Sequence, residues 1–248
     1  MSYHLPRLGE DPLAPFPDAG TALRRPDGLL AFGGDLSPPR LLNAYANGVF
    51  PWFSAGQPIL WWSPDPRTVF RTDGVRLSSR LRRGLRRVPW TVHADTAFEA
   101  VIRACAAVPR RGQDGTWITE EMQAAYVELH RRGHAHSIEV YGEGGPDGGR
   151  LVGGLYGVAL GRMFFGESMF SGESGGSKLA LAGVARRLAQ WGWPLIDAQV
   201  ASAHLSSLGA QDWPRAAFLA RVRALTAAAE PPGRWTARFG ALAVRDLG

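Results

Sequence analysis

Residues 153–200 of this chain read GGLYGVALGRMFFGESMFSGESGGSKLALAGVARRLAQWGWPLIDAQV, and this stretch decides the fold. Its apolar runs predict a strand over 151–160 and a second strand over 162–168. A Gly/Ser turn then opens onto a predicted helix over 177–190, and the run PLIDAQV predicts another strand over 195–200. Strands and a helix in this order indicate an α+β domain built on a mixed sheet.

Two acidic residues in this stretch have mainly apolar neighbours. Glu167 lies in the second predicted strand and Asp197 lies in the third. An ionised carboxylate is costly to place among Leu, Ile, Phe and Val unless a partner or a task compensates for the lost hydration. Two such acids on strands that bracket one helix indicate a site built for a cation.

Length and composition predict a soluble globular protein. The chain has 248 residues with 45% hydrophobic content, which suits one large domain or a small domain joined to a larger one. The start of the chain lacks the apolar core of a signal peptide, and no apolar run approaches the roughly 20 residues that span a bilayer. We therefore expect a cytoplasmic protein without membrane contact. The single cysteine, Cys105, excludes an internal disulfide and a cysteine-based zinc site.

The sequence pattern changes near residue 66. Residues 1–66 are rich in Pro, Gly and Trp, and Ser37-Pro38-Pro39 before RLLNAYANG predicts a capped short helix that stops at Gly48. We expect a small N-terminal α/β domain over 1–66 and a larger mixed domain over 67–248. In the larger domain we also expect strands over 68–70, 90–93 and 135–141, and helices over 77–87, 96–106, 119–132 and 215–228.

The net charge of +6 comes almost entirely from arginine, and the arginines are densest in VRLSSRLRRGLRR, residues 75–87. At helical spacing, Leu77, Leu81 and Leu85 form one apolar stripe and the arginines cover the remaining circumference. These arginines are Arg76, Arg80, Arg82, Arg83, Arg86 and Arg87. A basic amphipathic helix of this kind is either a solvated face or a surface for an anionic partner such as nucleic acid or a membrane.

Several common sites are excluded by their motifs. The turn over 172–179 lacks the Gly before Lys178 and the Ser or Thr after it that a Walker loop needs, and no GxGxxG fingerprint occurs. His134 and His136 lack a third ligand at metal-site spacing, and the residues around Ser168 do not form a GxSxG elbow. We therefore expect neither a bound metal nor a cofactor.

Aromatic residues gather between two proline turns near the end of the N-terminal region. The segment 52–62 contains four large rings, those of Trp52, Phe53, Trp61 and Trp62. Each ring taken alone is typical of a hydrophobic core. Together they point to a pocket.

Seven sequence motifs, which follow one another along the chain, resemble those of a known family. They are PDGLLAFGGDLSPPRLLNAYANGVFPWF, PILWWSPDPR, GTWITEEM, AHSIEV, LVGGLYGVALGRMFFGESMFS, PLIDAQV and HLSSLGA. From about Phe16 to Phe218 the chain resembles the bacterial leucyl/phenylalanyl-tRNA protein transferases. The resemblance implies a carboxy-terminal domain of the acetyltransferase-like (GNAT) fold behind a smaller domain. It also implies transfer of Leu or Phe, less well Met, from tRNA to the N-terminal Arg or Lys of a protein, which marks that protein for degradation through the N-degron pathway.

The resemblance also implies roles for particular residues. Glu167 of GES, together with Asp197 and Gln199 of IDAQ, matches the acceptor-binding and catalytic positions. We expect Asp197 to polarise Gln199 or the incoming amine, and Glu167 to hold the cationic acceptor terminus. It remains open whether Gln199 assists deprotonation or only positions the substrate. The positions around the substrate pocket are matched by Tyr45, Trp52, Trp117 and Met169. Val184 departs from the family pattern, since it lies where an aromatic residue can line the pocket.

The basic helix completes the expected partner surface. We expect its arginines to bind the acceptor stem of the aminoacyl-tRNA through phosphates, in a protein that acts as a monomer. One alternative is an acyl-CoA-dependent N-acyltransferase of the same fold, which needs a pyrophosphate loop where this chain has FSGESGGSK. Another is a noncatalytic RNA-binding module, which leaves Glu167, Asp197 and the tryptophans without a role.

Overall fold

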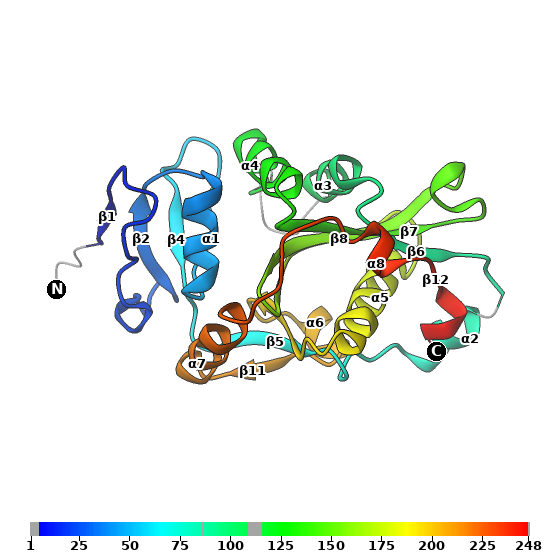
Figure 1. Ribbon diagram of the computed structural model, residues 1–248. Coiled ribbons are helices and arrows are strands. Elements are labelled where there is room, and N and C mark those ends of the chain that lie inside the picture. Colours follow the sequence, from blue (N-terminus) through cyan, green and yellow to red (C-terminus); the bar gives the residue numbers. More distant parts are fainter. Residues whose placement is uncertain (1–4, 86, 109–115, 248) are drawn as a thin grey trace.

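Two β-sheets organise the chain in the computed structural model, which describes residues 5–85, 87–108 and 116–247 (Figure 1). The smaller sheet has the strand order β1-β2-β4-β3. Its strands are β1 (Arg7–Leu8), β2 (Leu29–Gly33), β3 (Phe50–Pro51) and β4 (Leu60–Trp62). Helix α1 (Pro38–Ala46) connects β2 to β3 and lies on the side of this sheet that faces the rest of the molecule.

The larger sheet has the strand order β11-β5-β10-β9-β8-β7-β6-β12. Its strands are β5 (Arg67–Arg71), β6 (Thr91–Ala94), β7 (Ala135–Tyr141), β8 (Leu151–Leu160), β9 (Met163–Ser171), β10 (Leu195–Gln199), β11 (Gln211–Trp213) and β12 (Leu242–Ala243). Neighbouring strands are antiparallel except β9 and β10, which are parallel. Parallel strands need a long crossover connection, and helix α5 (Gly176–Gln190) supplies it.

Helices cover both faces of the larger sheet (Figure 1). Helices α3 (Phe98–Ala106) and α4 (Glu120–Arg131) pack on one face, and α5 packs on the other. The remaining helical segments lie near the sheet edges and the C-terminus. They are α2 (Ser79–Leu85), α6 (Ala203–Ser207), α7 (Arg215–Thr226), α8 (Thr236–Phe239) and the 3-10 turns η1 (Ala19–Thr21), η2 (Gly145–Asp147) and η3 (Val244–Leu247).

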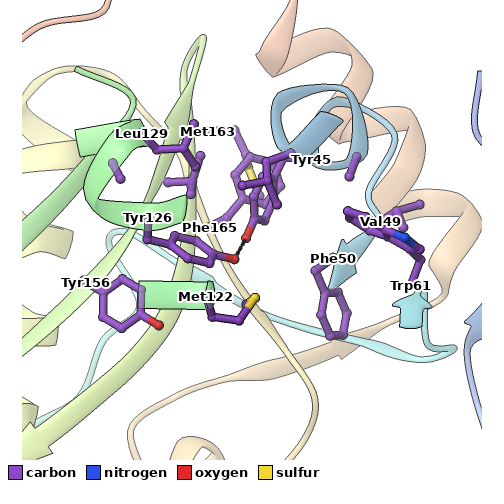
Figure 2. Packing of buried hydrophobic residues seen from close by; sticks show 14 of the residues in the cluster. Tyr45, Val49, Phe50, Trp61, Met122, Tyr126, Leu129, Tyr156, Met163 and Phe165 are labelled. Carbon is purple, nitrogen blue, oxygen red and sulfur yellow. Dashed lines mark hydrogen bonds between the residues drawn. The ribbon is translucent and has the colours of Figure 1, made fainter. Parts of the chain in front are cut away.

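The core has one hydrophobic cluster on each face of the larger sheet, because successive strand residues point to opposite faces. Met163 and Phe165 of β9 belong to the cluster under α4, whereas Phe164 belongs to the cluster under α5. We call these the α4-side cluster and the α5-side cluster. The α4-side cluster continues into the smaller sheet and contains Tyr45 and Trp61 (Figure 2). A single core therefore joins the two sheets.

The predicted α+β class and most predicted elements are confirmed. The strands over 135–141 and 151–160 have the expected bounds, and Thr119 caps α4 by accepting a hydrogen bond from the Met122 N–H. Two predictions need correction. The basic helix is shorter than expected, and Ser37 precedes α1 without making a side-chain cap. Among the described residues, no helix is both long and apolar enough to cross a bilayer.

Candidate active site

The site is built where β9 and β10 stop pairing. Their parallel register runs from Leu195 opposite Met163 to Asp197 opposite Phe165 and ends there. At the same level β9 carries a bulge against β8, because Gly166 pairs with Gly157 and Ser168 with Tyr156, so that Glu167 is the extra residue. Bulges are frequent beside active sites, where they redirect a side chain or end strand pairing.

The bulge gives Glu167 its orientation. Residues 163, 165 and 167 share the α4 side of the sheet, and beyond the bulge the alternation is reversed, so that Phe170 faces the α4 side and Met169 the α5 side. The Glu167 carboxylate therefore points toward α1 and α4. A second bulge lies at Ala198 of β10, between Asp197 and Gln199, next to the point where β9 and β10 stop pairing.

Two tyrosines hold the Glu167 carboxylate. The Tyr45 hydroxyl from α1 donates to Oε1 at 2.8 Å and the Tyr126 hydroxyl from α4 donates to Oε2 at 3.0 Å. The two hydroxyls also contact each other, as the dashed line between their oxygens shows (Figure 2). The Gln199 side-chain amide approaches Oε1 at 3.5 Å. Glu167 thus gathers groups from α1, α4 and β10.

Burial dominates the protonation of this network. Loss of hydration raises the pKa of Glu167 from 4.5 to about 7, although the two tyrosine hydrogen bonds act in the opposite direction. Loss of hydration and the neighbouring Glu167 charge raise the pKa of Tyr45 and of Tyr126 well above 10. Both tyrosines therefore remain hydrogen-bond donors while Glu167 changes its charge near neutral pH.

Asp197 has a different environment from Glu167. No part of its side chain is exposed, and both oxygens are bound by the Arg67 guanidinium of β5, at 2.8 Å (Nε to Oδ1) and 2.6 Å (Nη2 to Oδ2). Oδ1 also accepts the backbone N–H of Gln199 at 3.0 Å. Both Asp197 oxygens are thus bound by Arg67, although Asp197 also lines the apolar cavity described next.

An apolar cavity of about 260 Å³ opens on the α5 side of the sheet, where β9 and β10 stop pairing. Its apolar wall consists of Phe70, Leu155, Phe164, Met169, Leu181 and Ile196. Its polar end contains Glu167 and Gln199. The cavity is slightly smaller than the roughly 300–1,000 Å³ typical of pockets for whole drug-sized ligands. It suits a single apolar side chain.

A second cavity of about 400 Å³ opens on the side of the smaller sheet. Phe50, Trp52 and Trp117 line it, with the exposed Val200 at its rim. The two cavities share Glu167 and Gln199 as lining residues. Glu167 and Gln199 therefore lie at the junction of the two cavities, together with Ala198, Ser202 and Leu205.

The structure brings most of the predicted pocket residues together. Trp52 and Trp117 line the aromatic cavity, Met169 lines the apolar cavity, and Tyr45 binds Glu167. Val184 is placed differently. It has no exposed surface, lies in the α5-side cluster one turn beyond Leu181, and is not among the residues that line these two cavities.

The basic segment lies at the other end of the larger sheet from α1 (Figure 1). Five of its arginines are exposed, namely Arg76, Arg80, Arg82, Arg83 and Arg87. Arg86 lies outside the described residues. Arg76 and Arg82 line a groove of about 630 Å³ between this segment and α5, together with Arg186. The segment is thus a positively charged surface distinct from the two cavities.

Sequence reasoning missed two residues of the site. Tyr126 is one turn away from Met122 on α4 and reads as an ordinary core aromatic in an amphipathic helix, and Arg67 reads as one arginine among many. Their partners lie 41 and 130 residues away in the sequence. An arginine directly before an apolar strand run was the available signal, because buried charges require partners.

A carboxyl of near-neutral pKa lies at the junction of two cavities on a mixed sheet, an arrangement that suits proton transfer to or from a bound substrate. Comparison with known proteins specifies the class. The family model described as leucyl/phenylalanyl-tRNA protein transferase matches residues 69–223, and the model of its N-terminal domain matches residues 34–65. The chain belongs to this family and is an aminoacyltransferase.

Relatives of the same name cover nearly the whole chain. The leucyl/phenylalanyl-tRNA–protein transferase of Xanthomonas euvesicatoria pv. vesicatoria (strain 85-10) is 70% identical over 97% of this chain and 94% of the relative. That of Xanthomonas axonopodis pv. citri (strain 306) is 65% identical over 100% and 98%. That of Xylella fastidiosa (strain 9a5c) is 60% identical over 97% of both chains.

Proposed function

We propose that this protein transfers Leu or Phe, less well Met, from aminoacyl-tRNA to the N-terminal Arg or Lys of acceptor proteins. The observation that carries the proposal is the junction of an apolar and an aromatic cavity at Glu167 and Gln199. Transfer of an aminoacyl group needs a pocket for the side chain, a place for the terminal nucleoside and a group that receives the amine. The family name supports the tRNA donor and the protein acceptor.

The apolar cavity is the pocket for the transferred side chain. Leu, Phe and Met bury apolar surface against Leu155, Phe164 and Ile196. A polar side chain loses hydration there without gaining a partner, which rejects it. Removing one methylene costs only roughly 1–3 kcal/mol in such a pocket, so Val is a poor donor residue and not an excluded one.

The aromatic cavity receives the terminal nucleoside of the tRNA. Indole rings offer stacking surfaces to any base, worth about 1–3 kcal/mol per base. Trp52 and Trp117 both line this cavity, and each packs against the α4-side cluster on its other face. This placement sets the ester carbonyl of the donor between the two cavities, beside Glu167.

The chemistry needs little activation because an aminoacyl ester is already reactive toward an amine. The acceptor α-amine forms a bond to the ester carbonyl carbon and the carbon–oxygen bond to the ribose breaks. The Glu167 carboxylate takes up the proton that leaves the nitrogen, and the departing ribose oxygen gains a proton, which restores the balance. An α-amine has a pKa near 8, close to the value of about 7 for Glu167. Glu167 thus holds the ammonium group and takes its proton, while Gln199 orients the reacting groups.

The remaining proposals concern the rest of the molecule. The exposed arginines at 76, 80, 82, 83 and 87 bind acceptor-stem phosphates. The mixed sheet with its crossover helix α5 is of the acetyltransferase-like (GNAT) class. The chain divides into domains over 1–66 and 67–248, and it acts as a cytoplasmic monomer. Its products enter the N-degron pathway.

One assay tests the function. Purified protein is mixed with labelled Leu-tRNA and a peptide that begins with Arg, without ATP or CoA, and label in the peptide is measured. We expect label in this peptide and none in a matched peptide that begins with Asp. Transfer that requires acyl-CoA would favour an N-acyltransferase, and tRNA binding without transfer would favour a noncatalytic RNA-binding protein.

A further inference from the structure

A buried ion pair lies beneath the site and has no role in the proposed chemistry. Arg67 and Asp197 are both completely buried. The Arg67 guanidinium is packed between the rings of Phe50 and Phe218, at 4.8 and 4.6 Å from their centres. Its remaining nitrogen, Nη1, donates to the Gly48 carbonyl at 3.0 Å. The guanidinium thus binds protein groups with all three of its nitrogens.

The pair reaches the site through the backbone of Gln199. The Gln199 N–H donates to Oδ1 of Asp197, the same oxygen that Nε of Arg67 binds. Gln199 adopts a left-handed conformation with φ of 56°, which is unfavourable for a residue with a side chain unless its surroundings hold it. In this conformation its amide approaches the Glu167 carboxylate at 3.5 Å.

The same guanidinium also fixes the opposite wall of the site. Gly48 terminates the turn after α1, and Tyr45 lies in the last turn of that helix. One side chain from β5 therefore restrains both the helix that presents Tyr45 and the strand that presents Gln199. These are two of the groups that contact Glu167.

We propose that Arg67 is a positioning residue for the transfer reaction, and that its pair with Asp197 holds Gln199 in the left-handed conformation that presents its amide to Glu167. The proposal rests on the proposed function. Asp197 then acts through the peptide N–H of Gln199 and not by contact with the incoming amine. The alternative is that Arg67 only ties the smaller sheet to the larger one.

A second arginine provides the matched control for that alternative. Arg215 at the start of α7 binds the segment that connects the two sheets, since its Nη1 donates to the Ser63 carbonyl at 2.6 Å and its backbone N–H donates to Asp65 at 3.0 Å. None of these contacts involves Asp197 or Gln199. Loosening the junction between the sheets through Arg215→Met should therefore leave the transfer step unchanged.

The kinetic test compares Arg67→Lys, Arg67→Met with Asp197→Leu, and Arg215→Met. Lysine keeps the buried charge but cannot bridge both carboxylate oxygens. The double variant replaces a buried ion pair by apolar side chains, an exchange that proteins often tolerate, so it should fold. We expect kcat to fall about 100-fold in the double variant and by an intermediate factor in Arg67→Lys, with a nearly constant KM for Leu-tRNA. Arg215→Met should keep the kcat of the wild type.

A second measurement does not depend on activity. The Gln199 N–H is bonded to a carboxylate, so its amide resonance should lie downfield and its hydrogen exchange should be slow in the unmodified protein. Both properties should change in Arg67→Lys and in the double variant, and remain in Arg215→Met. If the protein transfers no label at all, the proposed function fails while this measurement still decides the role of Arg67.

The pH profile measures a further property, the electrostatic coupling of the Arg67–Asp197 pair to Glu167. Glu167 is faced by Tyr45 from α1, Tyr126 from α4, Asp197 and Gln199 from β10, and the Arg67 charge from β5. The Arg67 charge lowers the pKa of Glu167 and the Asp197 charge raises it. Arg67→Met should therefore move the acidic limb of kcat to higher pH, and Asp197→Asn should move it to lower pH.

Three results would overturn the proposal. One is a double variant that keeps the kcat of the wild type. Another is an Arg215→Met variant that is as slow as the double variant, which would assign the effect to the junction between the sheets. The third is a Gln199 amide whose shift and exchange rate are the same in the unmodified protein and in both Arg67 variants.

Discussion

At the scale of single residues, the site depends on a carboxyl group whose burial outweighs its hydrogen bonds. Glu167 accepts from Tyr45 and Tyr126, yet its pKa is raised to about 7. The raised pKa matches a group that exchanges a proton with an α-amine near neutral pH. The two tyrosines stay protonated across this range and keep the carboxylate in place in both charge states.

The transfer rate should depend on the ionised form of Glu167. Because its pKa is about 7, the single-turnover rate at saturating Leu-tRNA should rise with pH through that value and level off above it. Glu167→Gln should abolish this limb and lower the rate by about 10²–10⁴-fold, the range for loss of a general base. The measurement is the rate of peptide labelling from about pH 5 to about pH 9. A limb that persists in Glu167→Gln would assign the titration to another group.

The same substitution should stabilise the fold at higher pH. The folded pKa of about 7 lies above the usual 4.5, so the folded state binds extra protons in this window and the stability that Glu167 contributes is lost as pH rises through it. Glu167→Gln removes that loss, so the variant should be more stable than the unmodified protein. The difference in unfolding free energy should grow toward about 3 kcal/mol as pH rises from 4.5 to about 7. Urea unfolding at several pH values measures it. A gain that is constant with pH would contradict the prediction.

Sequence reasoning identified both acids for the same reason, and the structure separates them. Glu167 lines both cavities and is held by two tyrosines, whereas Asp197 lines only the apolar cavity and is paired with Arg67, which lies 130 residues away. An acid among apolar residues predicts a partner or a task but does not say which. The answer depends on what a distant strand places opposite it.

At the scale of elements, regular patterns were predictable and local irregularities were not. The alternation and turn residues around 135–160 predicted β7 and β8 with their observed bounds. The edge strands β11 and β12 are too short to carry a pattern, and the bulges at Glu167 and Ala198 are set by the partner strands. The site lies at those bulges, so its geometry required the tertiary structure.

The bulge at Glu167 should not tolerate a larger side chain on the partner strand β8. Gly157 lies opposite it, and a Cβ there would come within 2.2 Å of the Phe165 carbonyl oxygen. Gly157→Ala should cost about 1–3 kcal/mol of unfolding free energy and lower the transfer rate, because either strand must shift. Gly148→Ala is the control, since a Cβ at that position meets nothing within 4 Å. Equal stability of both variants would mean that the bulge absorbs the methyl group without strain.

The basic segment should act through charge alone. Replacing Arg82, Arg83 and Arg87 with Gln should raise the Kd for Leu-tRNA and flatten its dependence on salt, at a slope of about 0.9 per phosphate contact as on duplex DNA. Phosphate contacts carry no base information, so the loss should be similar for different tRNA sequences. Transfer from a minimal aminoacyl-adenosine donor should stay unchanged. Filter binding at several salt concentrations measures the slope.

The control for this prediction removes the same number of charges elsewhere. Arg103, Arg131 and Arg132 are exposed, and each lies beside a glutamate on α3 or α4. Their replacement with Gln should leave the salt slope close to that of the unmodified protein. A similar loss of affinity in both triple variants would mean that net charge, and not this segment, attracts the tRNA.

At the scale of the whole molecule, the two sheets depend on each other. The α4-side cluster contains Tyr45 and Phe50 from the smaller sheet region and Phe165 and Phe218 from the rest of the chain. Arg67 bonds across the same junction, and Arg215 binds the segment that connects the two sheets. The residues that contact Glu167 also come from both sides of it. The proposed boundary at residue 66 therefore separates two sequence regions that share one core and one site.

This dependence predicts one cooperative unfolding transition. Trp61 lies in β4 of the smaller sheet and Trp193 packs in the α5-side cluster of the larger sheet, so tryptophan fluorescence and far-UV circular dichroism should give coincident urea curves with one midpoint. A chain that begins at residue 67 should fail to show that transition, because its Phe165 and Phe218 would lose the apolar surface of Tyr45 and Phe50, and the Arg67 charge would lose its Gly48 partner. Two separated transitions in the full chain, or a cooperative transition of the shortened chain at the same midpoint, would instead establish that the regions fold independently.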